Sequence, residues 1–168
     1  MPKATLVPLE EYLSTSCRPD REYLDGVLLE RNVGEHDHSR LQMLLSSFLF
    51  TREAQCGIHV VPGQRVRVNP RRYRLPDVSV LAHNAQPTPI FTEPPFLCVE
   101  ILSRDDRMSE MQERIDDYLS FGVAYVWLID PRKRRAWIYT PTGMREAADR
   151  ILRTQNPDIK VPLGELFD

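Results

Sequence analysis

The chain has 168 residues, of which 42% are hydrophobic and 27% charged, and its formal net charge is −2. This length suits one domain with its own core, so residues 1–168 are taken as a single domain; the near-neutral charge excludes a protein that coats polyanions with its whole surface. Three widely spaced cysteines exclude a disulfide scaffold or a zinc ribbon, and no apolar run approaches the ~18 residues of a membrane span. We therefore expect a cytoplasmic protein without a membrane anchor.

The first part of the chain predicts two helices with a hairpin between them. Apolar residues at helical spacing indicate a short helix over 7–16. The Asp-Gly pair at 25–26 lies between apolar residues, which is a β-hairpin signal. A leucine-rich segment over 39–55 also has helical spacing, and we expect Asp37 or Ser39 to cap it.

The rest of the chain has the pattern of several strands around one further long helix. A proline-rich stretch over 83–95 can only be an irregular loop. The expected strands are 58–62, 64–70, 73–82, 96–103, 123–130 and 135–140, and the expected helix is 105–122. This mixture predicts a single α/β or α+β domain with a central sheet flanked by helices.

Two carboxylates lie in segments that are otherwise apolar. Asp77 opens one expected strand, and Glu100 lies in the middle of FLCVEIL, where strand alternation places it beside Cys98 on one of two buried faces. An ionised carboxylate there costs on the order of several kcal/mol unless a cation compensates it. A hard divalent cation such as Mg²⁺ would do so, but an arginine partner or a solvated strand end would as well, and spacing alone leaves these alternatives open.

The order of these segments carries a resemblance to a known family. RLPDVSV, a proline-rich loop, LCVEILS and a helix leading into YLSFGVAYVWLIDPRKRR resemble a bacterial restriction-endonuclease domain family, abundant in cyanobacteria and part of the PD-(D/E)XK nuclease superfamily. The resemblance implies a restriction-endonuclease-like mixed β-sheet flanked by helices. It also implies Mg²⁺ or Mn²⁺ as cofactor, with Asp77, Glu100 and the Ile101 carbonyl as ligands and Glu22 assisting through water.

One residue departs from the superfamily pattern. The superfamily's lysine, two residues after the acid, falls on Leu102, and the family's alternative lysine, four residues before a helical tyrosine, falls on Arg114. A guanidinium does not deprotonate in proteins, so Arg114 can offset charge on a phosphate but cannot activate water as a base. Both an active variant and an inactive site that has lost its lysine remain open.

Further candidates for contact with a substrate come from a basic segment and a histidine. Arg65, Arg67 and Arg74 lie in a ten-residue window without acids that leads toward Asp77, so they could position phosphates, although a solvated hairpin would look the same. His38 matches a family position and could act as a hydrogen-bond donor behind the metal ligands.

These observations together predict a Mg²⁺-dependent endonuclease that hydrolyses phosphodiester bonds in nucleic acid, DNA rather than RNA, with arginine in place of the usual lysine. The alternative is a catalytically inactive nuclease-like domain that binds nucleic acid or a protein partner, or serves a structural role in a larger system. A homodimer is left open, with the aromatic segment 137–139 as a candidate interface.

Overall fold

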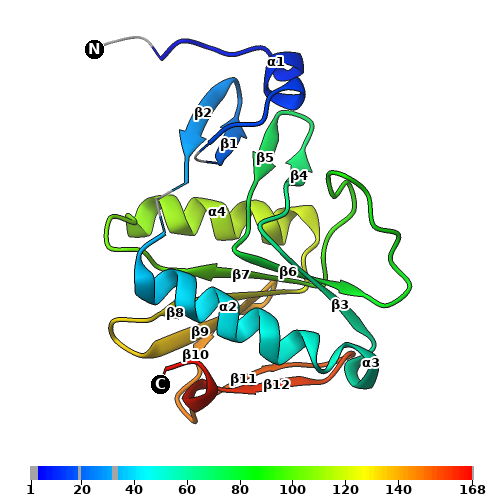
Figure 1. The fold of residues 1–168 in the computed structure, drawn as a ribbon, viewed down its shortest axis with the longest axis vertical. Helices are drawn as coiled ribbons and strands as arrows, with labels where there is room; N and C mark the ends of the chain where they lie inside the picture. The colour runs from blue at the N-terminus through cyan, green and yellow to red at the C-terminus, as the bar shows by residue number, and fades with distance from the viewer. Residues whose placement is uncertain (1–3, 19, 32–33, 168) are drawn as a thin grey trace.

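A computed structural model of the chain describes residues 4–18, 20–31 and 34–167. At its centre lies a six-stranded mixed sheet, in which β7 and β8 run parallel and the other neighbours antiparallel (Figure 1). In spatial order its strands are β10 (Gly143–Glu146), β9 (Arg135–Thr140), β8 (Tyr125–Asp130), β7 (Leu97–Ile101), β6 (Val78–Ala82) and β3 (Ile58–Pro62). The sheet is therefore of the mixed type that the resemblance implies.

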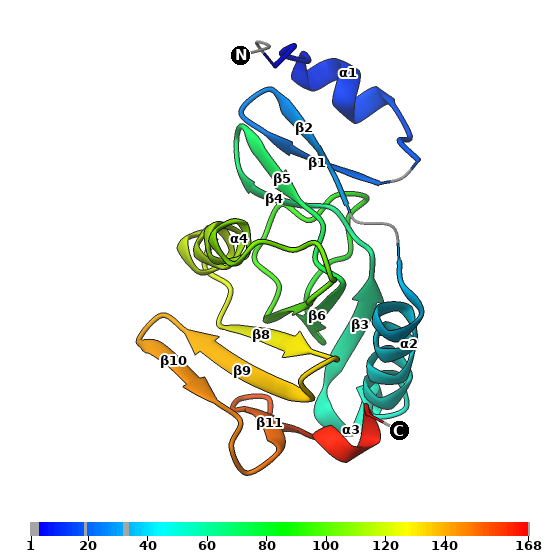
Figure 2. The same cartoon turned by 90° about the vertical axis from the view of Figure 1, so that its left-hand side faces the viewer.

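A long helix covers each face of this sheet. Figure 2 shows α4 (Met108–Phe121) and α2 (His36–Phe50) on opposite sides, with the sheet between them. In β7, the strand that carries Glu100, successive residues alternate between the two helices, and all five are buried. Leu97, Val99 and Ile101 lie in the core beneath α2, whereas Cys98 lies in the core beneath α4. The predicted alternation is confirmed, and it places Glu100 on the α4 side.

A second, four-stranded sheet lies between α4 and the short helix α1 (Leu9–Ser14) (Figure 2). Its strands, in spatial order, are β2 (Val27–Glu30), β1 (Arg21–Leu24), β5 (Arg72–Arg74) and β4 (Val66–Asn69). One face packs Tyr23 and Tyr73 against Tyr12 of α1, with ring centroids 5.2 and 5.6 Å from that of Tyr12. The other face turns Glu22 and Arg74 toward α4, because their side chains alternate with those of the tyrosines.

The remaining elements close the α2 side of the core. They are α3 (Glu53–Cys56), the hairpin β11 (Ile151–Thr154) and β12 (Ile159–Pro162), and the 3-10 helix η1 (Leu163–Glu165). Leu152 and Val161 of the hairpin are fully buried in the same cluster as the leucines of α2. No element was predicted for the segment beyond residue 140, so β10, β11, β12 and η1 are additions to the expected fold. None of the helices in the described ranges is long and apolar enough to cross a membrane.

Three local predictions are wrong. The helix expected over 39–55 begins at His36 and ends at Phe50, so Asp37 lies within its first turn and neither Asp37 nor Ser39 caps it; the N-cap is Glu35, without a side-chain hydrogen bond. The strand expected over 73–82 is two strands in different sheets. Pro76 lies between them and has no N–H with which to continue a ladder.

Candidate active site

Asp77 and Glu100 meet at one end of the central sheet. Asp77 immediately precedes β6, where its backbone N–H donates to the Val99 carbonyl at 3.0 Å, and its Oδ2 accepts the Ile101 N–H at 2.7 Å. Glu100 is fully buried in β7, and its Oε1 accepts a hydrogen bond from the Tyr118 hydroxyl at 2.6 Å. The N–H and C=O of a residue in an extended strand lie on the same edge, so the Ile101 carbonyl is also on the Asp77 side.

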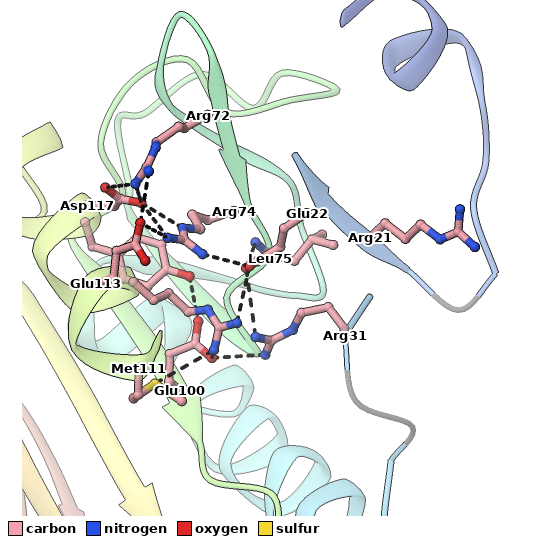
Figure 3. Close-up of polar contacts among 12 residues, drawn as sticks. Arg21, Glu22, Arg31, Arg72, Arg74, Leu75, Glu100, Met111, Glu113 and Asp117 are labelled. Atoms are coloured by element: carbon pink, nitrogen blue, oxygen red, sulfur yellow. Dashed lines mark hydrogen bonds and ion pairs between the residues drawn. The ribbon is translucent and has the colours of Figure 1, made fainter. Parts of the chain in front are cut away.

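A guanidinium lies between the two carboxylates. Arg31, directly after β2, places its Nη2 3.0 Å from Asp77 Oδ1 and 3.0 Å from Glu100 Oε2. Its Nη1 is 3.9 Å from Glu22 Oε1, so Arg31 faces three carboxylates at once; Figure 3 shows it beside Glu22 and Glu100. Arg31 is not among the residues that the sequence predicts for this site; the only signal for it was the rule that a buried glutamate needs a cation.

Glu22, the predicted accessory ligand, lies in the same cluster. It is fully buried, and it accepts hydrogen bonds from Arg74 at 3.0 Å, from Arg114 at 3.2 Å and from the Leu75 N–H at 3.0 Å. Burial raises the pKa of Glu22, but the surrounding guanidinium groups, Arg114 first and then Arg31, outweigh burial and hold that pKa below its ordinary value. Glu22 is therefore an ionised carboxylate behind the Asp77 and Glu100 pair.

Arg114 of α4 reaches the end of the sheet, as its position on the helix predicted. Its Nη2 is 3.2 Å from Glu22 Oε2 and its Nη1 is 3.8 Å from Glu100 Oε2. Even with Arg31 and Arg114 nearby, burial dominates and raises the pKa of Glu100 to about 7. Arg114 thus partly offsets the charge of both glutamates, whereas burial weakens the preference of Glu100 for the charged form.

Two side chains of α2 contact Asp77 from the other side of the sheet. His38 Nε2 lies 3.3 Å from Asp77 Oδ2, and Gln42 donates to the Asp77 backbone carbonyl at 2.8 Å. Burial raises the pKa of Asp77, but His38 and Arg31 outweigh it and hold that pKa below its ordinary value. The other ring nitrogen of His38 is buried and has no hydrogen-bond partner within the described part of the chain. The predicted position of His38 beside the site agrees with this geometry.

The three predicted basic residues lie in different environments. Arg74 is 1% exposed and donates to Asp117 at 2.8 Å as well as to Glu22, so it holds the cluster together and is not carried forward as a substrate contact. Arg65 lies with its guanidinium 5.4 Å from the centre of the Tyr12 ring, and Arg67 is half-buried on β4. Of these three predicted residues, Arg65 and Arg67 therefore remain candidates for contact with phosphates.

Two adjoining pockets open over this region. The first, about 170 Å³, is lined by Asp77, Arg31 and His38 among others. The second, about 310 Å³, is lined by Tyr12 and Arg65 among others. Both share the lining residues Asp20, Gly63 and Leu75. Asp77 thus lies at one end of a depression that continues toward Arg65.

The donor set fits a hard divalent cation only if Arg31 moves. Carboxylate oxygens and a backbone carbonyl are the ligands that Mg²⁺ and Mn²⁺ prefer, and the Asp77 and Glu100 oxygens converge on one point. That point is taken by the Arg31 guanidinium. Among the residues that the structure describes, no group of three or more His, Cys, Asp or Glu side chains is arranged to hold a metal ion.

The mixed six-stranded sheet between two long helices, with a second sheet beside α4, defines a mixed α+β domain. The chain belongs to the Uma2 family, described as "Putative restriction endonuclease", whose model matches residues 9–163. A crystal structure from Anabaena variabilis, described as a "putative nuclease belonging to DUF820", has the same fold: the TM-score is 0.82 and the identity 22%, over 96% of this chain and 97% of that one. Comparison with curated proteins finds no match. The predicted fold class and family resemblance are confirmed.

Proposed function

We propose that this chain is a nuclease that hydrolyses phosphodiester bonds with Mg²⁺ or Mn²⁺ held by Asp77, Glu100 and the Ile101 carbonyl. The observation that carries the proposal is the convergence of one oxygen from each carboxylate to within 3.0 Å of a single nitrogen. Two buried carboxylates on neighbouring strands are otherwise unfavourable, because like charges at short range raise each other's cost of ionisation. Membership of the Uma2 family supports the same assignment.

The side chains around the cation position have separate tasks in this proposal. A divalent cation held there supplies a lowered pKa for bound water and offsets charge on the phosphate. Arg114 stays protonated and adds positive charge behind Glu100, and Glu22 fixes Arg114 through the 3.2 Å hydrogen bond. His38 and Gln42 hold Asp77 from the α2 side, so that its carboxylate stays directed at Glu100.

The nucleic acid would follow the depression between the two pockets. Arg65 lies along it, and Arg18 lines the same pocket, which gives a phosphate backbone positive partners without base contacts. We propose DNA rather than RNA as substrate and keep Arg67 as a further phosphate contact beside Arg65. A homodimer and a cytoplasmic location stay predictions.

A cleavage and binding experiment on the full chain tests the proposal. Wild type, Asp77→Asn and the control Asp116→Asn, an exposed α4 residue that contacts Gln112, are incubated with Mn²⁺ or Mg²⁺ and with single- and double-stranded DNA and RNA. Metal-dependent cleavage that Asp77→Asn abolishes and Asp116→Asn retains supports the proposal. Faster cleavage by Arg114→Lys would further identify position 114 as part of the catalytic site.

The alternative function is a nuclease-like domain without catalysis that binds nucleic acid or a protein partner. The observation in its favour is the Arg31 guanidinium, which is hydrogen-bonded to both carboxylates and fills the space between them. An absence of metal binding at millimolar Mn²⁺, together with nucleic-acid binding that Arg65→Ala weakens, would favour this alternative over the enzyme.

A further inference from the structure

Arg31 contacts the same two oxygens that the proposed cation would bind. Its Nη2 is the shared partner of Asp77 Oδ1 and Glu100 Oε2, at 3.0 Å from each. A Mg²⁺ ion would lie about 2.1 Å from each oxygen, and a protonated guanidinium beside it would repel it. The guanidinium and a divalent cation therefore compete for one position.

The position of Arg31 in the site makes it the guanidinium that can leave. Its side chain is 16% exposed and lines the pocket over Asp77, so it has a path to solvent. Arg114 and Arg74 are 5% and 2% exposed, and both are held by Glu22 from within the fold. Loss of Arg31 from the site would also leave Glu22 with two of its three arginine partners.

We infer that Arg31 is the internal counter-ion of the metal-free site and that it exchanges with the divalent cation when the cation binds. The inference rests on the proposed metal-dependent function. It assigns Arg31 a role that opposes metal binding: each binding event must break the two hydrogen bonds of Nη2. Metal affinity in the wild type is then the intrinsic affinity of Asp77 and Glu100 reduced by the stability of the Arg31 pairing.

Removal of the Arg31 side chain should therefore tighten metal binding, which is the opposite of the usual effect of a mutation in a site. The full chain is freed of metal with EDTA, and free Mn²⁺ is followed by electron paramagnetic resonance during titration. We expect Arg31→Ala to bind Mn²⁺ about tenfold or more tightly than wild type, because two charge-assisted hydrogen bonds no longer have to be broken. Arg31→Gln keeps a hydrogen-bond donor without the charge and should also bind more tightly than wild type.

Arg21→Ala is the matched control. Arg21 lies on β1 of the same hairpin and pairs with Glu30 at 2.8 Å, and Figure 3 shows it directed away from the cluster. Its loss should leave the Mn²⁺ affinity unchanged. If Arg31→Ala does not fold in EDTA, the Mn²⁺ affinity of Arg31→Gln is compared with that of wild type instead.

The outcomes separate this inference from the proposed function. Tighter binding by the Arg31 variants than by wild type and Arg21→Ala supports the exchange. Equal or weaker binding by folded Arg31 variants, with clear binding by wild type, overturns the role of Arg31 and leaves the metal-dependent function standing. No Mn²⁺ binding by wild type or by any variant at millimolar concentration overturns both.

Discussion

Arg74 is the guanidinium whose loss should cost the fold most. Its side chain is 2% exposed and donates to Glu22 at 3.0 Å and to Asp117 at 2.8 Å. Arg74→Met keeps the apolar stem but leaves the fully buried Glu22 without one partner. Removing one member of a buried ion pair costs about 3–5 kcal/mol. We expect the lower end, about 3 kcal/mol, because Glu22 keeps the Leu75 N–H and Arg114.

The control is Arg72→Met on the same strand. Arg72 also pairs with Asp117, at 3.0 Å, but its side chain is 22% exposed and its other partners are at the surface. Exposed pairs contribute about 0.2–1 kcal/mol each and many contribute nothing measurable, so the loss of the three pairs of Arg72 should cost less than Arg74→Met. Urea denaturation in EDTA measures both losses, and thermal melting should show the Arg74 variant about 6–12 °C below wild type. Equal losses for the two variants would refute the reasoning from burial.

Tyr118→Phe removes the hydroxyl that donates to Glu100 and should lower the free energy of unfolding by about 1.5–3 kcal/mol in urea denaturation at pH 8; an unchanged midpoint would contradict it. The pKa of Glu100 rises from 4.5 to about 7 on folding, so between these pH values the folded, metal-free protein holds a proton that the unfolded chain has lost. The free energy of unfolding should therefore fall as pH rises from 4.5 to about 7, by up to about 1.4 kcal/mol per pH unit from this group. Denaturation midpoints of Glu100→Gln across that window should lack this fall. Gly122→Ala should cost about 1 kcal/mol or more in thermal melting, because φ is +114° and a Cβ would lie 3.1 Å from Pro94. The control Gly164→Ala should be neutral, because its Cβ would meet no atom of the described residues within 4 Å.

The sequence was sufficient to locate the two carboxylates because their signal is local. FLCVEIL is a short apolar run, and the two-residue period of a strand places Glu100 on a buried face without knowledge of any neighbour. The same local logic found the Asp25-Gly26 hairpin, where both residues adopt positive φ. It also found the end of α4 at Gly122, which has a left-handed C-cap conformation.

Arg31 was not predicted as a site residue because its partners are distant in the chain. It lies 69 positions before Glu100 and 46 before Asp77. No pattern in the residues around it distinguishes it from the other arginines of the chain, which has 19. The requirement for a compensating cation could be derived from the sequence, but its identity depends on how the two sheets pack on α4. The strands at 151–154 and 159–162 were missed for a different reason. The two apolar residues of the first, Ile151 and Leu152, are adjacent, and the second has only Ile159 and Val161 in alternation, so neither pattern predicts a strand without its partner.

The choice of arginine over lysine in this cluster has a consequence for how the site can change state. Arg31, Arg74 and Arg114 keep their protons at any ordinary pH, so the cluster cannot lose positive charge by titration. Its balance with Glu22, Asp77 and Glu100 can shift only through the carboxylates or through replacement of one guanidinium. The pKa of Glu100 near 7 opens the first route at neutral pH, and the exposed path of Arg31 opens the second. A cation that binds here therefore acts on Glu100, whose protonation can change, and on Arg31, which can leave the site. Glu22, Arg74 and Arg114 keep their contacts around them.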